Sequence, residues 1–291
     1  MEESLTGQNV IITGASRGLG AEIARSLRRQ GANILLVARD GEKLEVVRRE
    51  LENDSSCGAD VHWIAVDLAA DNAVDSVIEH GHKIWNSLFG LVNNAGMLGP
   101  IGKAWETDWK DWKQTIRVNL EVPIALSRLC VPWMAEGRTG KIINLSGGGA
   151  TGTRPNFSAY AVSKTGIVRF TENLALEVKD LNIQVNCIAP GALNTDMLKR
   201  VLEAGPEQSG LEEYEAALHQ ADAGGADPRL AAELCVFLMS SRADRITGKL
   251  ISAVWDPWSQ LDDYADDLAA SDIYTLRRIV PADRDRNWGN S

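Results

Sequence analysis

The chain has 291 residues, 44% of them hydrophobic, and carries a formal net charge of -10. This length and composition permit a sizeable buried core and argue against a disordered protein. The negative charge disfavours nucleic acid or an anionic membrane as a partner, and no apolar run approaches the length of a membrane span. The N-terminus lacks the basic and apolar regions of a signal peptide, so we expect a cytoplasmic protein.

The cysteines and histidines do not predict a metal site. His80 and His82 form a close pair, but no third ligand lies nearby in sequence, and we interpret the pair as part of a helix end. The cysteines are scattered, without paired metal-ligand spacing, and we expect buried reduced thiols. They are Cys57, Cys130, Cys187 and Cys235.

The first strand and the loop after it form a candidate dinucleotide site. Residues 9–12 are a short apolar run that predicts a buried strand, and a helical pattern through Ile23 and Leu27 follows. Between them lies a glycine loop, which reads Thr13-Gly14-Ala15-Ser16-Arg17-Gly18-Leu19-Gly20. Glycines between a strand and a helix let the backbone approach a pyrophosphate at the helix N-terminus. Their spacing differs from the usual Gly-x-Gly-x-x-Gly, so the interpretation depends on this context.

The end of the second strand indicates which cofactor binds. Residues 33–37 predict this strand, and Ala38, Arg39 and Asp40 follow it. At this place an acidic side chain would bind the ribose of NAD, and a basic one the 2′-phosphate of NADP. Arg39, together with Arg17, favours NADP(H). NAD(H) stays an alternative through Asp40, which we interpret instead as the N-cap of a helix over residues 41–53.

Strands and helices alternate along the rest of the chain. Further strands are predicted over residues 61–66, 88–92, 141–145, 183–188 and 249–254. Helices are predicted over residues 70–85, 161–178 and 228–239, with short helical pieces such as 211–219 in the acidic, glycine-punctuated segment 196–227. This alternation predicts an α/β fold in which helices cover both faces of a parallel sheet. We expect one domain over residues 1–254 and a C-terminal extension over residues 255–291.

Two features of the middle of the chain need explanation. Trp105, Trp109 and Trp112 have helical spacing, which we interpret as core packing or a subunit contact, not a ligand cage. Asn119 follows in an apolar stretch, and it needs hydrogen-bond partners if it is buried.

Tyr160 and Lys164 form the candidate catalytic pair. They are four residues apart on a predicted helix, so both side chains lie on one face. A free tyrosine titrates near pH 10, and a nearby ammonium favours the phenolate and lowers that pKa. The hydroxyl could then transfer protons near neutral pH. Alone, the spacing favours an ordinary Tyr/Lys pair on a solvated helix face, and the functional interpretation depends on the motifs around the pair.

The motifs around this pair occur in an order that resembles one family. They are Thr13-Gly14-x-x-x-Gly18-x-Gly20, Asn93-Asn94-Ala95-Gly96, Asn119, Ser146, Tyr160-x-x-x-Lys164 and Pro190-Gly191. Together they resemble the short-chain dehydrogenase/reductase family, in its single-domain branch of carbonyl reductases and alcohol dehydrogenases. The resemblance covers residues 5–254. It implies a Rossmann-type, doubly wound, seven-stranded parallel sheet and an oxidoreductase that interconverts a ketone and a secondary alcohol with a nicotinamide cofactor.

The resemblance also implies residue roles. Tyr160 would be the general acid or base, Ser146 would hydrogen-bond the substrate oxygen, and Lys164 would lower the pKa of the tyrosine and bind the nicotinamide ribose. Asn119 would hold a water that links Lys164 to solvent. The cofactor-binding residues would include Gly14, Ser16, Arg17, Gly18, Leu19 and Gly20 of the glycine loop, and Arg39. Asp67 and Leu68 would flank the adenine, and Asn93, Ala95 and Gly96 would lie on the adenosine ribose side. Tyr160, Lys164, Pro190, Gly191 and Thr195 would complete the set, the last three at the nicotinamide.

Three features depart from the family pattern. Ser146 lies one residue further from Tyr160 than the serine of the family usually does, which would put Gly147 in its place, although the triple glycine could absorb the difference. The usual acid-plus-glycines ending after the seventh strand is replaced by Ala-Val-Trp-Asp-Pro-Trp at 253–258. The tail from residue 255 is aromatic, which is unlike a disordered segment.

Several questions about partners and function stay open. We expect a small-molecule carbonyl or alcohol substrate and, because the helix 159–178 is apolar beyond one face, a homodimer or homotetramer. The tail could cover an active site, its own or a neighbour's, or could only join subunits. A cofactor-binding regulatory or assembly protein without turnover is the alternative function. Sugar epimerisation or dehydration, as in the two-domain branch, is a third.

Overall fold

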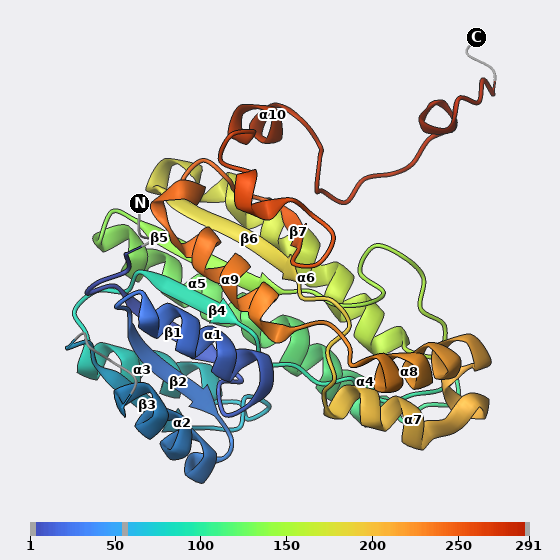
Figure 1. Ribbon diagram of the computed structural model, residues 1–291, viewed down its shortest axis with the longest axis horizontal. Coiled ribbons are helices and arrows are strands. Elements are labelled where there is room, and N and C mark those ends of the chain that lie inside the picture. Colours follow the sequence, from blue (N-terminus) through green and yellow to red (C-terminus); the bar gives the residue numbers. More distant parts are fainter. Residues whose placement is uncertain (1–3, 54–57, 289–291) are drawn as a thin grey trace.

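A parallel sheet forms the centre of the protein, in a computed structural model that describes residues 4–53 and 58–288. Its seven strands have the order β3-β2-β1-β4-β5-β6-β7 (Figure 1). They are β1 (Asn9–Thr13), β2 (Asn33–Ala38), β3 (Val61–Ala65), β4 (Gly90–Asn93), β5 (Gly140–Leu145), β6 (Ile183–Ala189) and β7 (Leu250–Ser252). Every predicted strand is confirmed. The chain reverses its direction of travel across the sheet between β1 and β4, and in such sheets ligands bind outside the carboxyl ends at that point.

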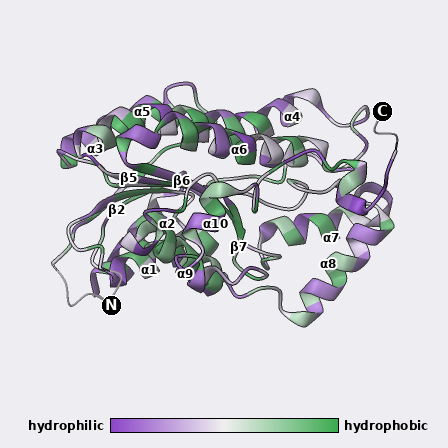
Figure 2. Cartoon of the chain, turned by 90° about the horizontal axis from the view of Figure 1, so that it is seen from above, coloured by the Kyte–Doolittle hydropathy of each residue, from purple (hydrophilic) through white to green (hydrophobic). Residues whose placement is uncertain are grey.

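Helices cover both faces of the sheet (Figure 2). On one face lie α1 (Gly18–Arg29), α2 (Gly41–Asn53) and α9 (Pro228–Met239), and on the other α3 (Ala73–Ile84), α5 (Val122–Glu136) and α6 (Ser158–Glu177). Neighbouring strand residues alternate between the two cores: Ile12 and Leu36 join the α1 side, whereas Ile11 and Leu35 join the α5 side. Strands buried on both faces explain why these runs are apolar throughout.

Several helices begin at side chains that cap them. Asp40 accepts a hydrogen bond from the backbone N–H of Lys43 at 3.1 Å, which confirms its interpretation as the cap of α2. Asp227 accepts one from the N–H of Arg229 at 2.9 Å, immediately before a proline in the first turn of α9. The ends of the predicted helices therefore follow from local side-chain chemistry.

The acidic segment 196–227 is more helical than the sequence suggested. It forms α7 (Asp196–Ser209) and α8 (Leu211–Ala223), which lie together beyond the sheet (Figure 2). Gly205, with φ of 70°, kinks α7 one residue before Pro206, and Gly210, with φ of 90°, separates the two helices. Gly205 and Gly210 are thus sharp bends between helical turns.

The tryptophan stripe lies at the surface. Trp109 and Trp112 stack with ring centroids 5.1 Å apart on α4 (Trp109–Ile116), and Trp112 donates a hydrogen bond to the Ser158 hydroxyl at 3.1 Å. Trp105 and Trp109 are 79% and 63% exposed, so core packing is wrong for these two. Trp109 lies in α4 and Trp105 in the turn before it, and the described residues leave both side chains exposed. A subunit contact stays a prediction for them.

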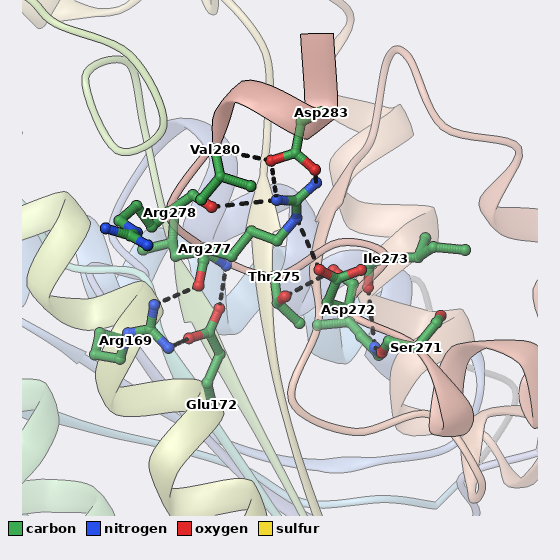
Figure 3. A network of polar contacts seen from close by, with 12 residues as sticks. Arg169, Glu172, Ser271, Asp272, Ile273, Thr275, Arg277, Arg278, Val280 and Asp283 are labelled. Carbon is green, nitrogen blue, oxygen red and sulfur yellow. Dashed lines mark hydrogen bonds and ion pairs between the residues drawn. The ribbon is translucent and has the colours of Figure 1, made fainter. Parts of the chain in front are cut away.

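The C-terminal extension wraps around the free edge of β7. Leu261 and Leu268 join the core on the α9 side, and Leu276 packs with Val168 of α6 on the opposite side. Between them, the Tyr274 carbonyl accepts a hydrogen bond from the N–H of Leu250 in β7 at 2.8 Å. Figure 3 shows the polar contacts of this segment with α6. Contacts with a neighbouring subunit stay a prediction.

The described part of the chain contains free buried thiols and no helix that could span a membrane. Cys130, Cys187 and Cys235 are buried and free, as expected for these three, whereas Cys57 lies outside the described residues. Burial raises the pKa of the Cys187 thiol to about 12. None of the helices in residues 4–53 and 58–288 has the length and apolarity needed to cross a membrane.

Candidate active site

The glycine loop is bonded directly to the loop after β4. The Thr13 hydroxyl accepts hydrogen bonds from the N–H groups of Asn94 and Ala95, each at 3.0 Å. In return the Asn94 amide donates to the carbonyls of Thr13 and Gly14 at 2.9 and 3.2 Å. Gly14 has a φ of 68°, and a Cβ on it would lie 2.8 Å from the Asn94 amide nitrogen. Thr13 and Asn94, which sequence reasoning did not assign to the site, therefore fix the loop on which the cofactor prediction rests.

The first turn of α1 fits a pyrophosphate. A Cβ on Gly20 would overlap the Gly14 carbonyl oxygen, so glycine is required for helix and loop to approach. The N-cap residue Arg17 makes no capping bond, and the first turn holds no acidic residue. The terminal N–H groups of this helix are thus available to an anion, and the helix dipole favours one. Near them lie the half-buried Ser16 and the buried Leu19.

The two arginines expected to select NADP have different surroundings. Arg39 is exposed just after β2, and no hydrogen bond or ion pair engages its side chain within residues 4–53 and 58–288. Arg17 forms an ion pair with Asp196, the first residue of α7, and so links the glycine loop to that helix. Asp40 is occupied by its cap bond and by an ion pair with Lys43 at 2.7 Å. Of the two strand-end side chains, Arg39 is the one left available for a ligand.

The residues predicted beside the adenine and its ribose divide into two groups. Asp67 is exposed at the end of β3, while Leu68 is buried. Asn93 is only 3% exposed, and its amide donates to Asn144 at 2.9 Å and to the Ser127 hydroxyl at 3.3 Å. Its side chain therefore faces α5, and its place beside the adenosine ribose stays a prediction. Successive side chains on a strand point to opposite faces, so that the next asparagine faces the glycine loop instead.

Asn119 lies where the helix after α4 widens into a π-helical turn, η1 (Arg117–Glu121). Its amide donates to the Met97 carbonyl at 2.8 Å and to the Ser163 hydroxyl at 3.1 Å, and its oxygen accepts from the Met97 N–H at 2.8 Å. The expectation that this asparagine is hydrogen-bonded is confirmed. A Cβ on Gly96 would lie 3.5 Å from the Asn119 oxygen and 3.7 Å from the Lys164 ammonium nitrogen. These three residues therefore meet at one point.

Tyr160 and Lys164 lie on one face of α6, as the spacing predicts. The ammonium nitrogen is 5.6 Å from the tyrosine ring centroid and donates to the Leu145 carbonyl at 2.8 Å. Burial lowers the pKa of Lys164 to about 8. Burial also raises the pKa of Tyr160, against the opposing effect of the Arg154 charge. This direction is opposite to the one predicted, because desolvation of the phenolate outweighs the attraction of nearby cations.

Gly147, and not Ser146, faces the tyrosine hydroxyl. A Cβ on Gly147 would overlap the Tyr160 hydroxyl oxygen. Ser146 is 4% exposed, and its hydroxyl has no hydrogen-bond partner among the described residues. Gly147 therefore lies next to the tyrosine hydroxyl, and the role of Ser146 at the substrate oxygen stays a prediction. Ser146 directly follows β5, and its N–H donates to the Ile188 carbonyl at 2.8 Å.

The residues predicted at the nicotinamide lie in the turn after β6 and at the start of α7. Gly191 has a φ of 86°, and a Cβ there would lie 2.6 Å from the Val254 side chain, so this turn passes close to the end of the last strand. Pro190 is half-buried, and Thr195 caps α7 by accepting from the Met197 N–H at 3.3 Å. The residues predicted here lie at the carboxyl end of β6, on the same side of the sheet as the glycine loop.

One site residue was missed by the sequence reasoning. Arg154 lies in the loop before α6, with its guanidinium carbon 4.2 Å from the Phe157 ring centroid and 5.6 Å from that of Tyr160. It pairs with Glu213 of α8. In the sequence, the feature that could have indicated Arg154 was its positive charge between the triple glycine and Tyr160. Within the described part of the chain, no group of three or more His, Cys, Asp or Glu side chains could hold a metal ion.

Known proteins resemble this chain over most of its length. Residues 8–205 match the model of the short chain dehydrogenases. The 2,3-dihydro-2,3-dihydroxybenzoate dehydrogenase of Bacillus subtilis is 32% identical over 84% of this chain and 94% of its own length. The 5-keto-D-gluconate 5-reductase of Escherichia coli is 30% identical over 85% and 94%.

The solved structures include a similar one with ligands. L-sorbose reductase from Gluconobacter frateurii, complexed with NADPH and L-sorbose, superposes with a TM-score of 0.77 at 32% identity, over 87% of this chain and 97% of that one. The family match, the order of the strands and the location of the motifs all indicate the same family. The chain belongs to the short-chain dehydrogenase/reductase family and is a nicotinamide-dependent oxidoreductase of the ketone and alcohol type.

Proposed function

We propose that this chain is an NADP(H)-dependent reductase of a small polar carbonyl compound, with Tyr160 as the proton donor. The observation that carries the proposal is the convergence of Tyr160, Lys164, Asn119 and Gly96 at one point, on the same side of the sheet as a helix N-terminus that fits a pyrophosphate. A nicotinamide dinucleotide, when bound, supplies or accepts the hydride. The glycine loop would hold its phosphates, and Arg39 its 2′-phosphate.

The protonation states of the pair suit reduction at neutral pH. The raised pKa of Tyr160 keeps its hydroxyl protonated, and in this form it can give a proton to the substrate oxygen. The Lys164 pKa of about 8 lies close to the working pH, so this ammonium can exchange a proton readily. Its bond to the Leu145 carbonyl at 2.8 Å fixes its position below the tyrosine ring.

Three of the similar proteins support a polar substrate, whereas others are named for a 3-oxoacyl-[acyl-carrier-protein] or a 3beta-hydroxysteroid. The names of the three specify 5-keto-D-gluconate, a dihydroxylated dihydrobenzoate and L-sorbose. Tyr160 is 7% exposed beneath α7 and α8, where Phe157, Val201 and Ala217 complete an apolar cluster around it. Such a site would exclude water from the reacting oxygen.

The role of Tyr160 is tested by Tyr160→Phe. This variant should bind NADPH normally, while its turnover with a responsive ketone falls roughly 10²- to 10⁴-fold, the contribution of a general acid. Tyr264→Phe, at a 52% exposed tyrosine of the extension, is the matched control. Wild-type turnover in Tyr160→Phe, with cofactor binding measured by calorimetry intact, would exclude the proposed mechanism.

The preference for NADP is tested by Arg39→Ala. Loss of a charge-assisted hydrogen bond to phosphate should weaken NADPH binding roughly tenfold or more, and NADH binding hardly at all. Arg286→Ala, at an exposed arginine of the extension, controls for the loss of one positive charge. Tighter binding of NADH than NADPH by the unmodified protein, in calorimetry, would show that NAD is the cofactor instead.

A further inference from the structure

Arg154 is held beside the candidate proton donor in a largely buried position. Its side chain is 19% exposed, and its guanidinium covers the rings of Phe157 and Tyr160. A guanidinium over an aromatic ring keeps its hydrogen-bonding edges free for other partners. Arg154 therefore places a positive charge next to Tyr160, and its stacking on the two rings leaves its N–H groups able to donate hydrogen bonds.

Only one edge of this guanidinium is occupied by the protein. Nε donates to Glu213 Oε1 at 3.0 Å, and Nη2 donates to the same oxygen. Among the described residues no acceptor bonds Nη1, which lies 3.5 Å from the point that a Cβ on Gly148 would occupy. The free donors thus border Gly148 of the triple glycine, and the guanidinium carbon lies 5.6 Å from the centroid of the Tyr160 ring.

The chemistry of this free edge selects an anion. Arginine binds carboxylates through paired N–H donors in a fixed plane, and such bonds are stronger than neutral ones. Gly147 and Gly148 have no side chains that could fill the space in front of Nη1. Glu213 holds the other edge and so fixes the plane of the guanidinium before any ligand arrives, which lowers the entropic cost of binding.

We propose that Arg154 binds a carboxylate carried by the substrate, so that the preferred substrates are keto acids and the corresponding hydroxy acids. This inference rests on the proposed function and narrows its substrate class. Arg154 is then a specificity-determining residue that touches the substrate, and Glu213 is its positioning residue. The carbonyl of the substrate would lie at the Tyr160 hydroxyl, with the carboxylate on the Gly148 side.

The test compares keto acids with their neutral esters on the NADPH-loaded enzyme. Acetoacetate and levulinate are the acids, and their methyl esters are the neutral partners. The unmodified enzyme should show a KM roughly 10- to 100-fold lower for each acid than for its ester, in line with a charge-assisted hydrogen bond. Arg154→Gln should remove this difference by raising the KM of the acids, with the esters unchanged.

Two further variants separate substrate binding from a structural role. Glu213→Gln still accepts the hydrogen bonds from Arg154 but removes the competing negative charge, so the KM of the acids should fall or stay constant. If Arg154 only joined its loop to α8, Arg154→Gln and Glu213→Gln would each change the KM of acids and esters by the same factor. That result would show the proposal to be wrong. Arg128→Gln, at an exposed arginine of α5, controls for the loss of charge.

A binding measurement keeps the test independent of turnover. Calorimetric titration of levulinate into the NADP⁺-loaded protein should give binding that Arg154→Gln weakens roughly tenfold or more and Arg128→Gln does not. Binding of this kind without turnover of any ketone would sink the proposed reaction and leave the anion site standing. Turnover of the esters with equal or lower KM than the acids would overturn the anion site and leave the reaction standing.

Discussion

Residue 147 packs so closely against the Tyr160 hydroxyl that only glycine fits at this position. A Cβ at this position would overlap the hydroxyl oxygen, so Gly147→Ala must displace the tyrosine tip. Displacement of a reacting group by about 1 Å can lower turnover on the order of 10²-fold. We expect Gly147→Ala to lower kcat by about this factor while NADPH binding, measured by calorimetry, stays the same.

The neighbouring Gly152 provides the control for this substitution. It lies in the same loop, is exposed, and has no heavy atom within 4 Å of the position of its Cβ. Gly152→Ala should therefore leave kcat unchanged. If both alanine variants lose activity equally, flexibility of the loop explains the result and the packing of Gly147 against the hydroxyl does not.

Lys164 links the stability of the protein to alkaline pH. Its pKa is about 8 in the folded protein, compared with 10.5 for an ordinary lysine, because burial disfavours the ammonium. Between these two pH values the unfolded chain keeps a proton that the folded protein has lost. The free energy of unfolding should therefore rise with pH in this window, by on the order of 3 kcal/mol from this group.

Urea unfolding at several pH values checks this linkage. The difference in the free energy of unfolding between wild type and Lys164→Met should shift in favour of wild type from pH 8 to pH 10.5. Subtraction of the variant removes the contribution of the other lysines and tyrosines. A constant difference across the window would mean that Lys164 keeps an ordinary pKa in the folded protein.

Side chains fixed by local geometry could be predicted from the sequence, and those fixed by distant contacts could not. Tyr160 and Lys164 meet because the helical repeat brings residues four apart together. Arg154 is held by Glu213, 59 positions along the chain, and Asn94 by Thr13, 81 positions back. No spacing rule relates these pairs. The direction of the Tyr160 pKa shift was missed for the same reason, since burial is a property of the fold.

At the scale of elements, hydrophobic pattern and caps determined what could be predicted. The helix over residues 228–239 was predicted with its observed bounds, and the structure shows Asp227 capping it before Pro228. In α7 and α8 the glycines at 205 and 210 have positive φ and bend the chain between helical turns. A sequence pattern cannot distinguish such a bend from a loop, and these helices were therefore predicted only as short pieces.

The extension is held to the sheet edge by a buried carboxylate. Glu172 of α6 is 9% exposed, accepts a hydrogen bond from the Leu276 N–H at 2.6 Å and pairs with Arg169, which itself donates to the Leu276 carbonyl (Figure 3). Beyond this contact, Arg277 pairs with Asp272 at 2.7 Å and with Asp283 at 2.6 Å. The segment 272–276 therefore lies along the edge of β7, where it bonds the backbone N–H of Leu250 that would otherwise be open to other chains.

Truncations separate this structural role from a role in the active site. A chain that ends at Ser259 lacks Leu261, Ala265 and Leu268, each 3% exposed, and a buried leucine contributes roughly 1.5–3 kcal/mol. It should therefore unfold at markedly lower urea concentration than wild type. A chain that ends at Arg278 keeps these residues and should be as stable as wild type, with the same KM. A raised KM in this longer chain would show that residues after 278 reach an active site.

At the scale of the whole molecule, the outer face of α5 and α6 carries apolar side chains without a cover in the described chain. Val162 and Leu176 of α6 are 50% and 76% exposed, and Leu129 of α5 is 42% exposed. On α6 the two lie about four helical turns apart, and so on the same side of the helix. The opposite side of α6 packs into the core through Ile167 and Leu174. A helix that is apolar on both sides is typical of burial on both sides.

A second copy of the chain is the partner we predict for this face, in a homodimer or homotetramer. Light scattering at micromolar concentration should give a mass at least twice that of the chain. Leu176→Asp places a charge on the predicted interface and should shift the protein towards the monomer, because an unpaired carboxylate is costly to bury. Leu211→Asp, at a 62% exposed leucine of α8, should leave the mass unchanged. A monomeric wild type, or equal dissociation by both variants, would contradict an interface built on α6.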